Sequence, residues 1–328
     1  MLHIDSLHTV LDTDHGLVRA VDDLALSIER GETFALVGES GCGKSMTALS
    51  ILRLLPDNGR VAEGTIEIGD TDVVQLPEAR MRDVRGRRVS IIFQEPATSL
   101  NPVMKVGDQI VEVIERHTAI KGAAARAKAV EWLTRVGIPE PARRADDYPF
   151  QLSGGQKQRV MIAIALAADP EIVIADEPTT ALDVTIQAQI LRLLKKLSRE
   201  HEAAVIVITH DLGVVAGMCQ RILVMYAGRI VESGPAKPLF ARPHHPYTVG
   251  LLKSVPRLNE PRADSLQTIM GLPPDLAHLP PGCAFAPRCF LATDECWAAA
   301  PELFPTAPGR HSACFHFDQL REPSEVPA

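Results

Sequence analysis

Short runs of apolar residues alternate with longer helical patterns through the first 235 residues of the chain. The short runs are rich in Val and Ile, which is typical of strands that are buried on both faces of a sheet. The longer segments repeat apolar positions every three to four residues and therefore predict helices. The predicted strands are 32–38, 88–94, 171–177, 203–210 and 221–232, and the predicted helices are 44–55, 106–117, 123–137 and 185–201.

This alternation of strands and helices predicts an α/β fold with a mostly parallel sheet covered by helices. Residues 96–165 carry helical patterns but no strand signal. We therefore expect a helical subdomain of about that extent, inserted between two strands of the sheet.

The composition changes after residue 235, because 16 of the 25 prolines lie between Pro235 and Pro327. Proline has no backbone N–H to donate, so dense proline is incompatible with long helices and central strands. We expect a first domain over 1–235 and a loop-rich appendage over 236–328. A small loop-rich module usually needs a staple to hold its fold.

The net charge of −7 and the pI of about 5.9 argue against a surface built to bind the phosphate backbone of nucleic acid. The basic run RMRDVRGRR at 80–88 is interpreted as a solvated face. The first residues lack the pattern of a signal peptide, and no apolar stretch approaches the roughly 20 residues of a membrane span. We expect a chain that does not cross the bilayer and stays in a reducing compartment, where structural disulfides are rare.

The segment GESGCGKS at 38–45 fits the pattern G-x-x-x-x-G-K-[ST] and joins a predicted strand to a predicted helix. Its glycines let backbone N–H groups face phosphates, and the helix N-terminus adds partial positive charge. In this pattern Lys44 reaches the β- and γ-phosphates and the Ser45 hydroxyl holds Mg²⁺. The segment predicts a nucleoside triphosphate site, and a glycine-rich turn without a ligand is the alternative.

The predicted strand EIVIADE at 171–177 ends in two carboxylates, and Pro178 stops it there. We expect Asp176 to bind Mg²⁺ through water, because a carboxylate at the tip of a buried strand suits that ion. Glu177 is then placed to orient or deprotonate an attacking water. The alternative is an acidic pair in solvent at a strand end. The P-loop upstream and the stop at Pro178 favour the Mg²⁺ site over this alternative.

The segment LSGGQ at 152–156 precedes a predicted helix, and Ser153 stands at a capping position before two glycines. This is a second backbone site for an anion, and one nucleotide rarely needs two such sites in one chain. The segment resembles the signature motif of the ATP-binding subunits of ABC transporters. The resemblance implies that two such domains sandwich ATP, with the signature of one domain facing the P-loop of the other.

Other segments match the same family in order along the chain. Gln94 resembles the Q-loop glutamine, ALD at 181–183 resembles the D-loop, and His210 after VIVIT resembles the switch histidine that contacts the γ-phosphate. The resemblance implies catalytic roles for Glu177, His210 and Gln94. It further implies Mg²⁺ contacts from Ser45, Gln94 and Asp176, and nucleotide contacts from Gly38, Glu39, Ser40, Gly41, Cys42, Gly43, Lys44, Ser45, Met46, Gln94, Ser153, Gly154, Gly155, Gln156, Asp176 and Asp183.

The family fold is a P-loop NTPase core with an antiparallel N-terminal β part, and the resemblance implies it for residues 1–235. One element departs from the family pattern. An aromatic residue usually stacks on adenine, but LHTVLDTDHGLVRAV at 7–21 contains none. His15 or Leu11 could take that place, and discrimination between ATP and GTP stays open.

Two further segments narrow the family, QEPATSLNPVMKVGDQI at 94–110 and HPYTVGLLKSVP at 245–256. They resemble importers of oligopeptides, dipeptides, nickel and opines, and the match to the D-type peptide subunit runs nearly to the C-terminus. The resemblance implies ATP-driven import of peptides at the cytoplasmic face of the cell membrane, with nickel, opines or another small solute as the alternative. The implied partners are a similar ATPase subunit, two transmembrane permeases and an extracytoplasmic substrate-binding protein.

An ABC ATPase that acts on nucleic acid is the first alternative class, and a free-standing regulatory ATPase, which no sequence feature supports, is the second. Chromosome-type members insert a long coiled coil, but only 107 residues separate Ser45 from Ser153 and no heptads run through them. Repair-type members carry C-x₂-C zinc pairs, and those spacings are absent from the sequence. No nucleic-acid partner is expected.

Four of the six cysteines lie in the proline-rich appendage, as Cys283-x₅-Cys289-x₆-Cys296-x₁₇-Cys314. Structural zinc sites show tighter pairs, whereas four thiolates match an iron–sulfur cluster. The resemblance to peptide importers implies a 4Fe–4S cluster that staples the appendage and has no redox role. A zinc site, with His311 or His316 as a substitute ligand, and unligated or disulfide-bonded cysteines are the alternatives.

Overall fold

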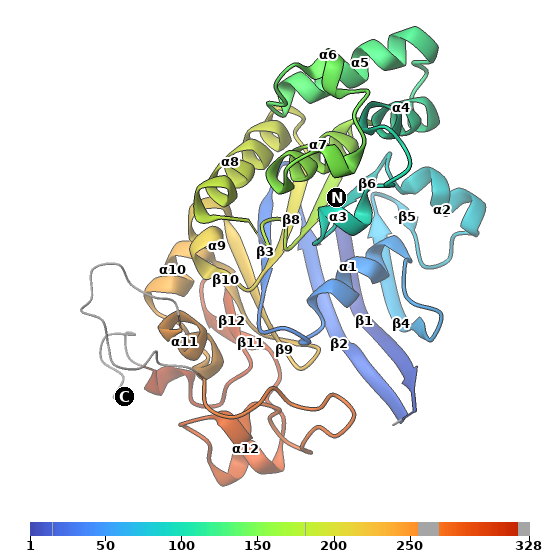
Figure 1. Cartoon of the computed structure of the whole chain (residues 1–328). Coiled ribbons are helices and arrows are strands. Elements are labelled where there is room, and N and C mark those ends of the chain that lie inside the picture. Colours follow the sequence, from blue (N-terminus) through green and yellow to red (C-terminus); the bar gives the residue numbers. More distant parts are fainter. Residues whose placement is uncertain (15, 181, 255–268, 321–328) are drawn as a thin grey trace. The chain divides into compact units, whose positions relative to one another are not determined.

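The computed structural model describes residues 1–14, 16–180, 182–254 and 269–320 (Figure 1). The chain divides into two compact units. One unit comprises Met1, Ile28–Glu32 and Gln75–Ile208, and the other comprises Leu2–Ser27, Thr33–Val74 and Thr209–Ala328. His15, a candidate for the adenine contact, and Ala181 of the ALD segment lie outside the described residues.

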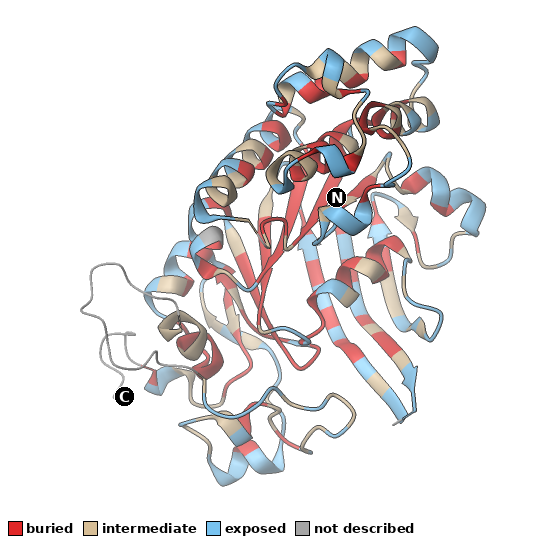
Figure 2. Cartoon of the chain, viewed as in Figure 1, coloured by how far each residue is buried: buried red, intermediate tan, exposed pale blue. Residues whose placement is uncertain are grey.

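The unit formed mainly by Gln75–Ile208 contains three parallel strands. β6 (Val89–Ile92) pairs with β7 (Ile172–Asp176), and β7 pairs with β8 (Ala204–Thr209). Every residue of β7 and β8 is buried, as predicted for strands covered on both faces (Figure 2).

Between β6 and β7 the chain forms helices and no strand, which confirms the expected helical insertion. Helix α4 buries Ile110 and Ile114, one turn apart, and α5 buries Ala129 and Trp132, so each helix turns one apolar face inward. The helices are α3 (Pro96–Ser99), α4 (Val106–His117), α5 (Gly122–Arg135), α6 (Pro141–Arg144), the 3₁₀ helix η1 (Pro149–Gln151) and α7 (Gly154–Leu166). Helix α2 (Glu78–Val84) precedes β6, and α8 (Val184–Glu200) follows β7.

The other unit begins with an antiparallel sheet in the order β2-β1-β4-β5. Leu2, Ile4 and Leu7 of β1 are fully buried, so this strand contributes apolar side chains to the core. The sheet confirms the antiparallel N-terminal β part. Its strands are β1 (Leu2–Thr13), β2 (Gly16–Ile28), β4 (Gly59–Ile68) and β5 (Thr71–Asp72).

A second group of strands in this unit carries the P-loop. β3 (Thr33–Val37) is parallel to β9 (Arg221–Tyr226), and β9 is antiparallel to β10 (Arg229–Pro235). The predicted single strand 221–232 is thus a hairpin, because the chain reverses at Ala227 and Gly228 with φ of 49° and 82°. Two positive φ angles are typical of a two-residue hairpin turn, and glycine adopts them without strain.

The described part of the region after residue 235 is rich in loops, as its proline content predicts, and it also contains short strands and helices. Two short strands, β11 (Phe304–Ala307) and β12 (Arg310–Ser312), pair with each other, and β12 pairs with β10. The helices of this unit are α1 (Lys44–Leu52), α9 (Leu212–Met218), α10 (Ala236–Ala241), α11 (Pro246–Lys253), η2 (Ala286–Arg288), α12 (Asp294–Ala298) and η3 (Phe317–Gln319). Across the described ranges, no helix combines the length and the apolar character that a membrane crossing requires.

Candidate functional site

The P-loop is the tight turn between β3 and α1. Gly43 has a φ of 108°, and a Cβ at this position would collide with the carbonyl oxygen of Ala20. A Cβ on Gly38 would collide with the carbonyl oxygen of Met225. Only glycine therefore allows the loop to pass so close to β2 and β9. The turn delivers the chain to the start of α1, where the first N–H groups have no partner within the helix and can donate to an anion.

Lys44 is enclosed by the loop that precedes it. Its side chain is 4% exposed, and Nζ donates to the carbonyl oxygens of Gly38 at 2.9 Å and Glu39 at 2.8 Å. The ammonium group therefore adds positive charge inside the loop, while Ser45 is exposed at the first turn of α1. Cys42 is buried, and burial raises the pKa of its thiol, so its side chain is a small neutral group within the loop.

The carboxylate pair that ends β7 is held in a defined geometry. Asp176 is 7% exposed, and Glu177 has a φ of 44°, a left-handed conformation that costs a non-glycine residue roughly 1–2 kcal/mol. The N–H of Glu177 donates to the carbonyl oxygen of Ile208 at 2.9 Å, which fixes the peptide. Its carboxylate oxygen Oε2 accepts from Gln94 Nε2 at 2.7 Å and from Thr180 Oγ1 at 3.0 Å.

The structure thus brings together two residues that the sequence predicted separately, Gln94 and Glu177. The sequence did not identify Thr180, although its position three residues after Glu177 places its hydroxyl within reach when the chain turns. A strained residue whose side chain is fixed by two donors is typical of a functional site.

The signature segment forms a reciprocal cap at the start of α7. Ser153 Oγ accepts from the N–H of Gln156 at 3.4 Å, and Gln156 Oε1 accepts from the N–H of Ser153 at 2.9 Å. This capping box keeps the side chains off the first N–H groups of the helix at Gly154 and Gly155. Ser153 and Gly154 are exposed, so the helix N-terminus is open to an anion.

Asp183 of the D-loop segment and His210 after β8 are two further residues that the family resemblance predicted. Asp183 is the N-cap of α8, where its Oδ1 accepts from the N–H of Ile186 at 3.0 Å. His210 lies directly after β8 and is exposed. Leu11 lies in β1 opposite Gly59 and is half-buried.

Comparison with known proteins identifies the family. A family model described as ABC transporter matches residues 21–180, and a model described as oligopeptide/dipeptide transporter, C-terminal region, matches residues 231–296. The dipeptide transport ATP-binding protein DppD of Bacillus subtilis is 51% identical over 277 residues, which cover 84% of this chain and 82% of the relative. The oligopeptide transport ATP-binding protein OppD of Salmonella typhimurium is 49% identical over 279 residues, which cover 85% and 83%. The chain belongs to the ABC transporter ATPases.

A solved structure agrees with this assignment. The ATP-binding cassette MJ0796, in a dimeric post-hydrolysis state bound to ADP and Pi, aligns with a TM-score of 0.65 and 30% identity over 72% of this chain and 99% of that chain. The predicted class is thereby confirmed. As an ABC ATPase, the protein binds ATP with Mg²⁺ and hydrolyses it.

The appendage of this ABC ATPase contacts the P-loop, which the sequence did not predict. The N–H of Glu39 donates to Tyr247 Oη at 2.7 Å, and the Glu39 carboxylate accepts from Arg288 Nη1 at 2.6 Å and Nη2 at 2.9 Å. Tyr247 is fully buried in α11, and Arg288 ends η2. Both residues lie beyond residue 235, so the second residue of the P-loop is held by the C-terminal region.

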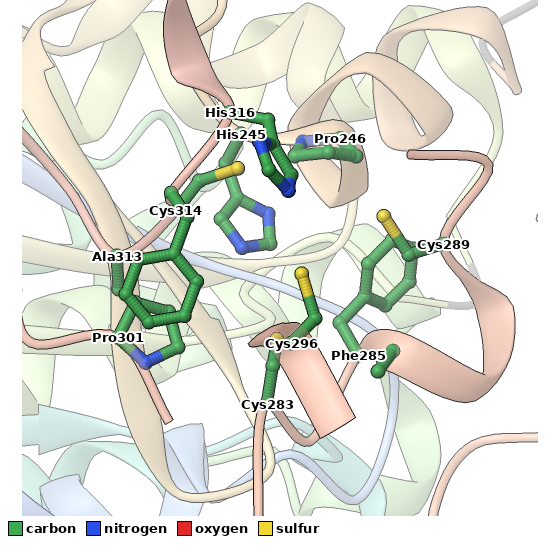
Figure 3. A pocket seen from close by; sticks show the side chains of 12 residues that line it. His245, Pro246, Cys283, Phe285, Cys289, Cys296, Pro301, Ala313, Cys314 and His316 are labelled. Carbon is green, nitrogen blue, oxygen red and sulfur yellow. The ribbon is translucent and has the colours of Figure 1, made fainter. Parts of the chain in front are cut away.

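The four C-terminal cysteines of the ATPase line one cavity (Figure 3). Cys289 follows η2, Cys296 lies in α12, and Cys314 follows β12, while the N–H of Cys283 donates to the carbonyl oxygen of Cys296 at 2.8 Å. Figure 3 shows the sulfur atoms of Cys289, Cys296 and Cys314 around the shared space. All six cysteines of the chain are free thiols, so no disulfide closes this region.

Three of the four cavity cysteines have thiols with a raised pKa. Burial raises the pKa of Cys283, raises that of Cys289 to about 11 and raises that of Cys314 to about 12, with smaller contributions from the neighbouring thiols. His316, a candidate zinc ligand, lines the cavity, as does His245, which the sequence did not single out. Within the described ranges, no three or more His, Cys, Asp or Glu side chains are grouped closely enough to hold a metal ion.

Proposed function

We propose that this ATPase energises the import of peptides across the cell membrane, acting as a peripheral subunit at its cytoplasmic face. The observation that carries the proposal is the extent of the similarity. The relatives named for dipeptide and oligopeptide transport are about half identical over 84–85% of the chain, and the C-terminal model of such transporters matches residues 231–296. Importers of nickel, opines or other small solutes share this subunit type and are the alternative.

The proposed machine contains a similar second ATPase, two transmembrane permeases and an extracytoplasmic substrate-binding protein. Two domains are assigned to the chain, a nucleotide-binding domain over 1–235 and a C-terminal domain over 236–328. The open N-terminus of α7 supports the pairing with a second ATPase, because its first N–H groups, at the exposed Gly154 and the half-buried Gly155, suit a phosphate bound to another subunit.

Hydrolysis in this proposal depends on positioning and charge neutralisation. Lys44 and the N–H groups of the P-loop bind the phosphates, and Ser153 with Gly154 completes the partner's site. Glu177 accepts a proton from the attacking water, and Gln94 and Thr180 hold its carboxylate in place. His210 contacts the γ-phosphate. Mg²⁺, which Ser45, Asp176 and Gln94 would hold, neutralises phosphate charge when bound.

A separate element of the proposal concerns the C-terminal cysteines. Cys283, Cys289, Cys296 and Cys314 would hold a 4Fe–4S cluster, which cross-links the appendage when bound. Four sulfur atoms around one cavity support this assignment, since Cys₄ ligation is standard for such clusters. A single zinc ion would need its ligands to converge much more closely.

Uptake by cells tests the transport proposal. Cells whose own copy is replaced by the wild-type chain or by Glu177→Gln are given a radiolabelled dipeptide, a labelled oligopeptide or radioactive nickel. We expect peptide uptake in the wild type, its loss in the variant, and nickel uptake that is equal in both. Loss of nickel uptake with peptide uptake unchanged would reverse the assignment.

Metal analysis tests the cysteine assignment independently of transport. The full chain is purified without oxygen and assayed for iron, sulfide and zinc. We expect about four iron and four sulfide per chain, with broad absorption in the blue. Cys289→Ser should lose iron, whereas Cys219→Ser, a buried cysteine outside the cavity, should retain it. Wild-type iron content in Cys289→Ser would refute the assignment.

A further inference from the structure

Arg288 is fixed on all sides at the end of η2. Its side chain is 5% exposed, and its Nε donates to the carbonyl oxygen of Met270 at 3.0 Å. Both terminal nitrogens donate to the Glu39 carboxylate, and Nη1 also approaches Tyr226 Oη at 3.4 Å. A planar guanidinium that makes two parallel bonds to a carboxylate is among the strongest pairs in proteins, and here the Glu39 side chain is 24% exposed.

Glu39 is fixed in turn from both ends of its peptide. Its N–H donates to Tyr247 Oη at 2.7 Å, and its carbonyl oxygen accepts from Lys44 Nζ at 2.8 Å. Two consecutive contacts, Arg288 to Glu39 and Glu39 to Lys44, therefore join the residue before Cys289 to the P-loop lysine.

A pocket beside the P-loop also shows that the C-terminal region lies close to this loop. Residues 39–42 line one part of it, and Pro273, Pro274 and Leu276 of the C-terminal region line another. The C-terminal region thus lies along the phosphate-binding loop, and its residues control what surrounds the Glu39 carboxylate.

The negative charge of Glu39 affects the binding of phosphates. A carboxylate at the second position of a phosphate-binding loop repels the highly charged phosphates of ATP, unless a cation neutralises it. At about 0.1 M salt this repulsion reaches roughly 10 Å. Arg288 is the cation that neutralises Glu39, and its two bonds also restrict the rotation of the carboxylate.

We propose that Arg288 is a positioning residue for ATP binding, which neutralises Glu39 and fixes the P-loop so that the C-terminal cysteine region sets the affinity for nucleotide. The inference rests on the ATPase activity and does not depend on the group that the cysteines bind. It predicts an effect on ATP affinity with little change in the rate of the chemical step, because the two bonds that Arg288 makes to Glu39 act on the P-loop.

A double-mutant cycle that removes the two charges in the full chain tests the proposal. ATP binding is measured by titration with a fluorescent ATP analogue. Arg288→Gln should raise the Kd about tenfold, which corresponds to ~1.4 kcal/mol. The double variant Arg288→Gln with Glu39→Gln should bind ATP more tightly than Arg288→Gln alone, because it also lacks the carboxylate that repels the phosphates. The deficit of Arg288→Gln should shrink at high salt, since the repulsion is screened.

Arg85→Gln is the matched control, because Arg85 makes the same two-bond pair with Glu78 at 2.6 and 3.2 Å on an exposed helix. It should bind ATP as the wild type does. Equal weakening in Arg288→Gln and in the double variant, or wild-type affinity in Arg288→Gln, would overturn the proposal. Absence of ATP binding by the wild type would instead contradict the ATPase assignment.

Thermal unfolding of each variant separates a positioning effect from a loss of fold. If Arg288→Gln does not fold, Arg288→Lys carries the test, because an ammonium group keeps the charge but not the two parallel bonds. We expect an intermediate Kd with an unchanged kcat for that variant. A wild-type Kd would overturn the positioning role.

Discussion

Gln94 Nε2 donates a 2.7 Å hydrogen bond to Oε2 of Glu177. The two side chains come from positions 83 residues apart, one after β6 and the other at the end of the neighbouring strand β7. The contact links the proposed Q-loop glutamine to the carboxylate proposed to activate water. A movement of the Q-loop can therefore change the orientation of the proposed general base.

Replacing Glu177 tests the role of that carboxylate. Glu177→Gln keeps the shape of the side chain but cannot accept a proton, so turnover should fall about 10²–10⁴-fold. ATP affinity should be retained, because the P-loop is untouched. Single-turnover hydrolysis with nucleotide binding on the same sample measures both quantities, and undiminished turnover would contradict the assignment.

Replacing Gln94 tests the contact itself. Gln94→Ala removes one donor to a charged acceptor, a bond worth about 1.5–3 kcal/mol, and should lower kcat roughly tenfold or more. Thr180→Val removes the other side-chain donor at 3.0 Å and should have a similar effect. Steady-state kinetics would show a change in kcat rather than in Kd for ATP. A wild-type kcat in both variants would show that the orientation of Glu177 does not depend on them.

Lys44→Ala should abolish measurable ATP affinity, because the ammonium is the one buried cation that the P-loop itself supplies among the described residues 38–45. The carbonyl oxygens of Gly38 and Glu39 also lose their donor, so a modest loss of thermal stability should accompany it. Equilibrium binding checks the first effect and a melting curve the second. Normal binding would make the P-loop assignment wrong.

The buried pair between Arg310 and Glu232 should dominate the stability of the C-terminal region. Nη2 of Arg310 donates to Glu232 Oε1 at 3.0 Å, and the two side chains are 7% and 0% exposed. Arg310→Met leaves a buried carboxylate without its cation and should lower the free energy of unfolding by about 3–5 kcal/mol.

The stability of Arg310→Met should depend on pH, because Glu232 is titratable. Burial raises the pKa of Glu232, so the folded state binds a proton on this carboxyl more readily than the unfolded state does, and the penalty of the unpaired carboxylate grows as pH rises. Arg310→Met should thus recover part of its stability as pH falls toward 5, as denaturant titrations would show. A loss that is independent of pH would contradict the role of the charge.

His244 should make the fold sensitive to mild acid. Burial, and then the charges of Arg310 and Arg242, lower its pKa from 6.5 to about 4, so the folded state holds it neutral. Its stabilising contribution is complete above pH 6.5 and is lost as pH falls toward 4. In His244→Gln the melting temperature should change less with pH between pH 6.5 and pH 4 than in the wild type. An unchanged slope of melting temperature against pH would contradict the prediction.

Local pattern determined most of the fold and most of the nucleotide motifs. Runs of Val and Ile predicted β7 and β8, which are buried along their whole length, and the absence of strand signals predicted the helices between β6 and β7. The turn at Gly43 and the cap at Ser153 follow from residue types whose backbone preferences act over a few positions. Such preferences can be read from sequence because they need no distant partner.

Long-range packing decided the rest. The run 221–232 has the composition of one strand, and only a turn at Ala227 and Gly228 divides it into β9 and β10. Proline content predicted loops beyond residue 235, yet β12 adds to β10 because a free strand edge was available for pairing.

The contacts that surround the P-loop were also beyond the sequence pattern. Arg288 lies 249 residues from Glu39, and Tyr247 lies 208 residues from it. Nothing in the local sequence of an arginine or tyrosine specifies which acceptor or donor it will meet, because that depends on how separate segments pack. The sequence by itself therefore determined that this chain binds and hydrolyses ATP. Only the tertiary structure placed the cysteine-bearing region against the P-loop.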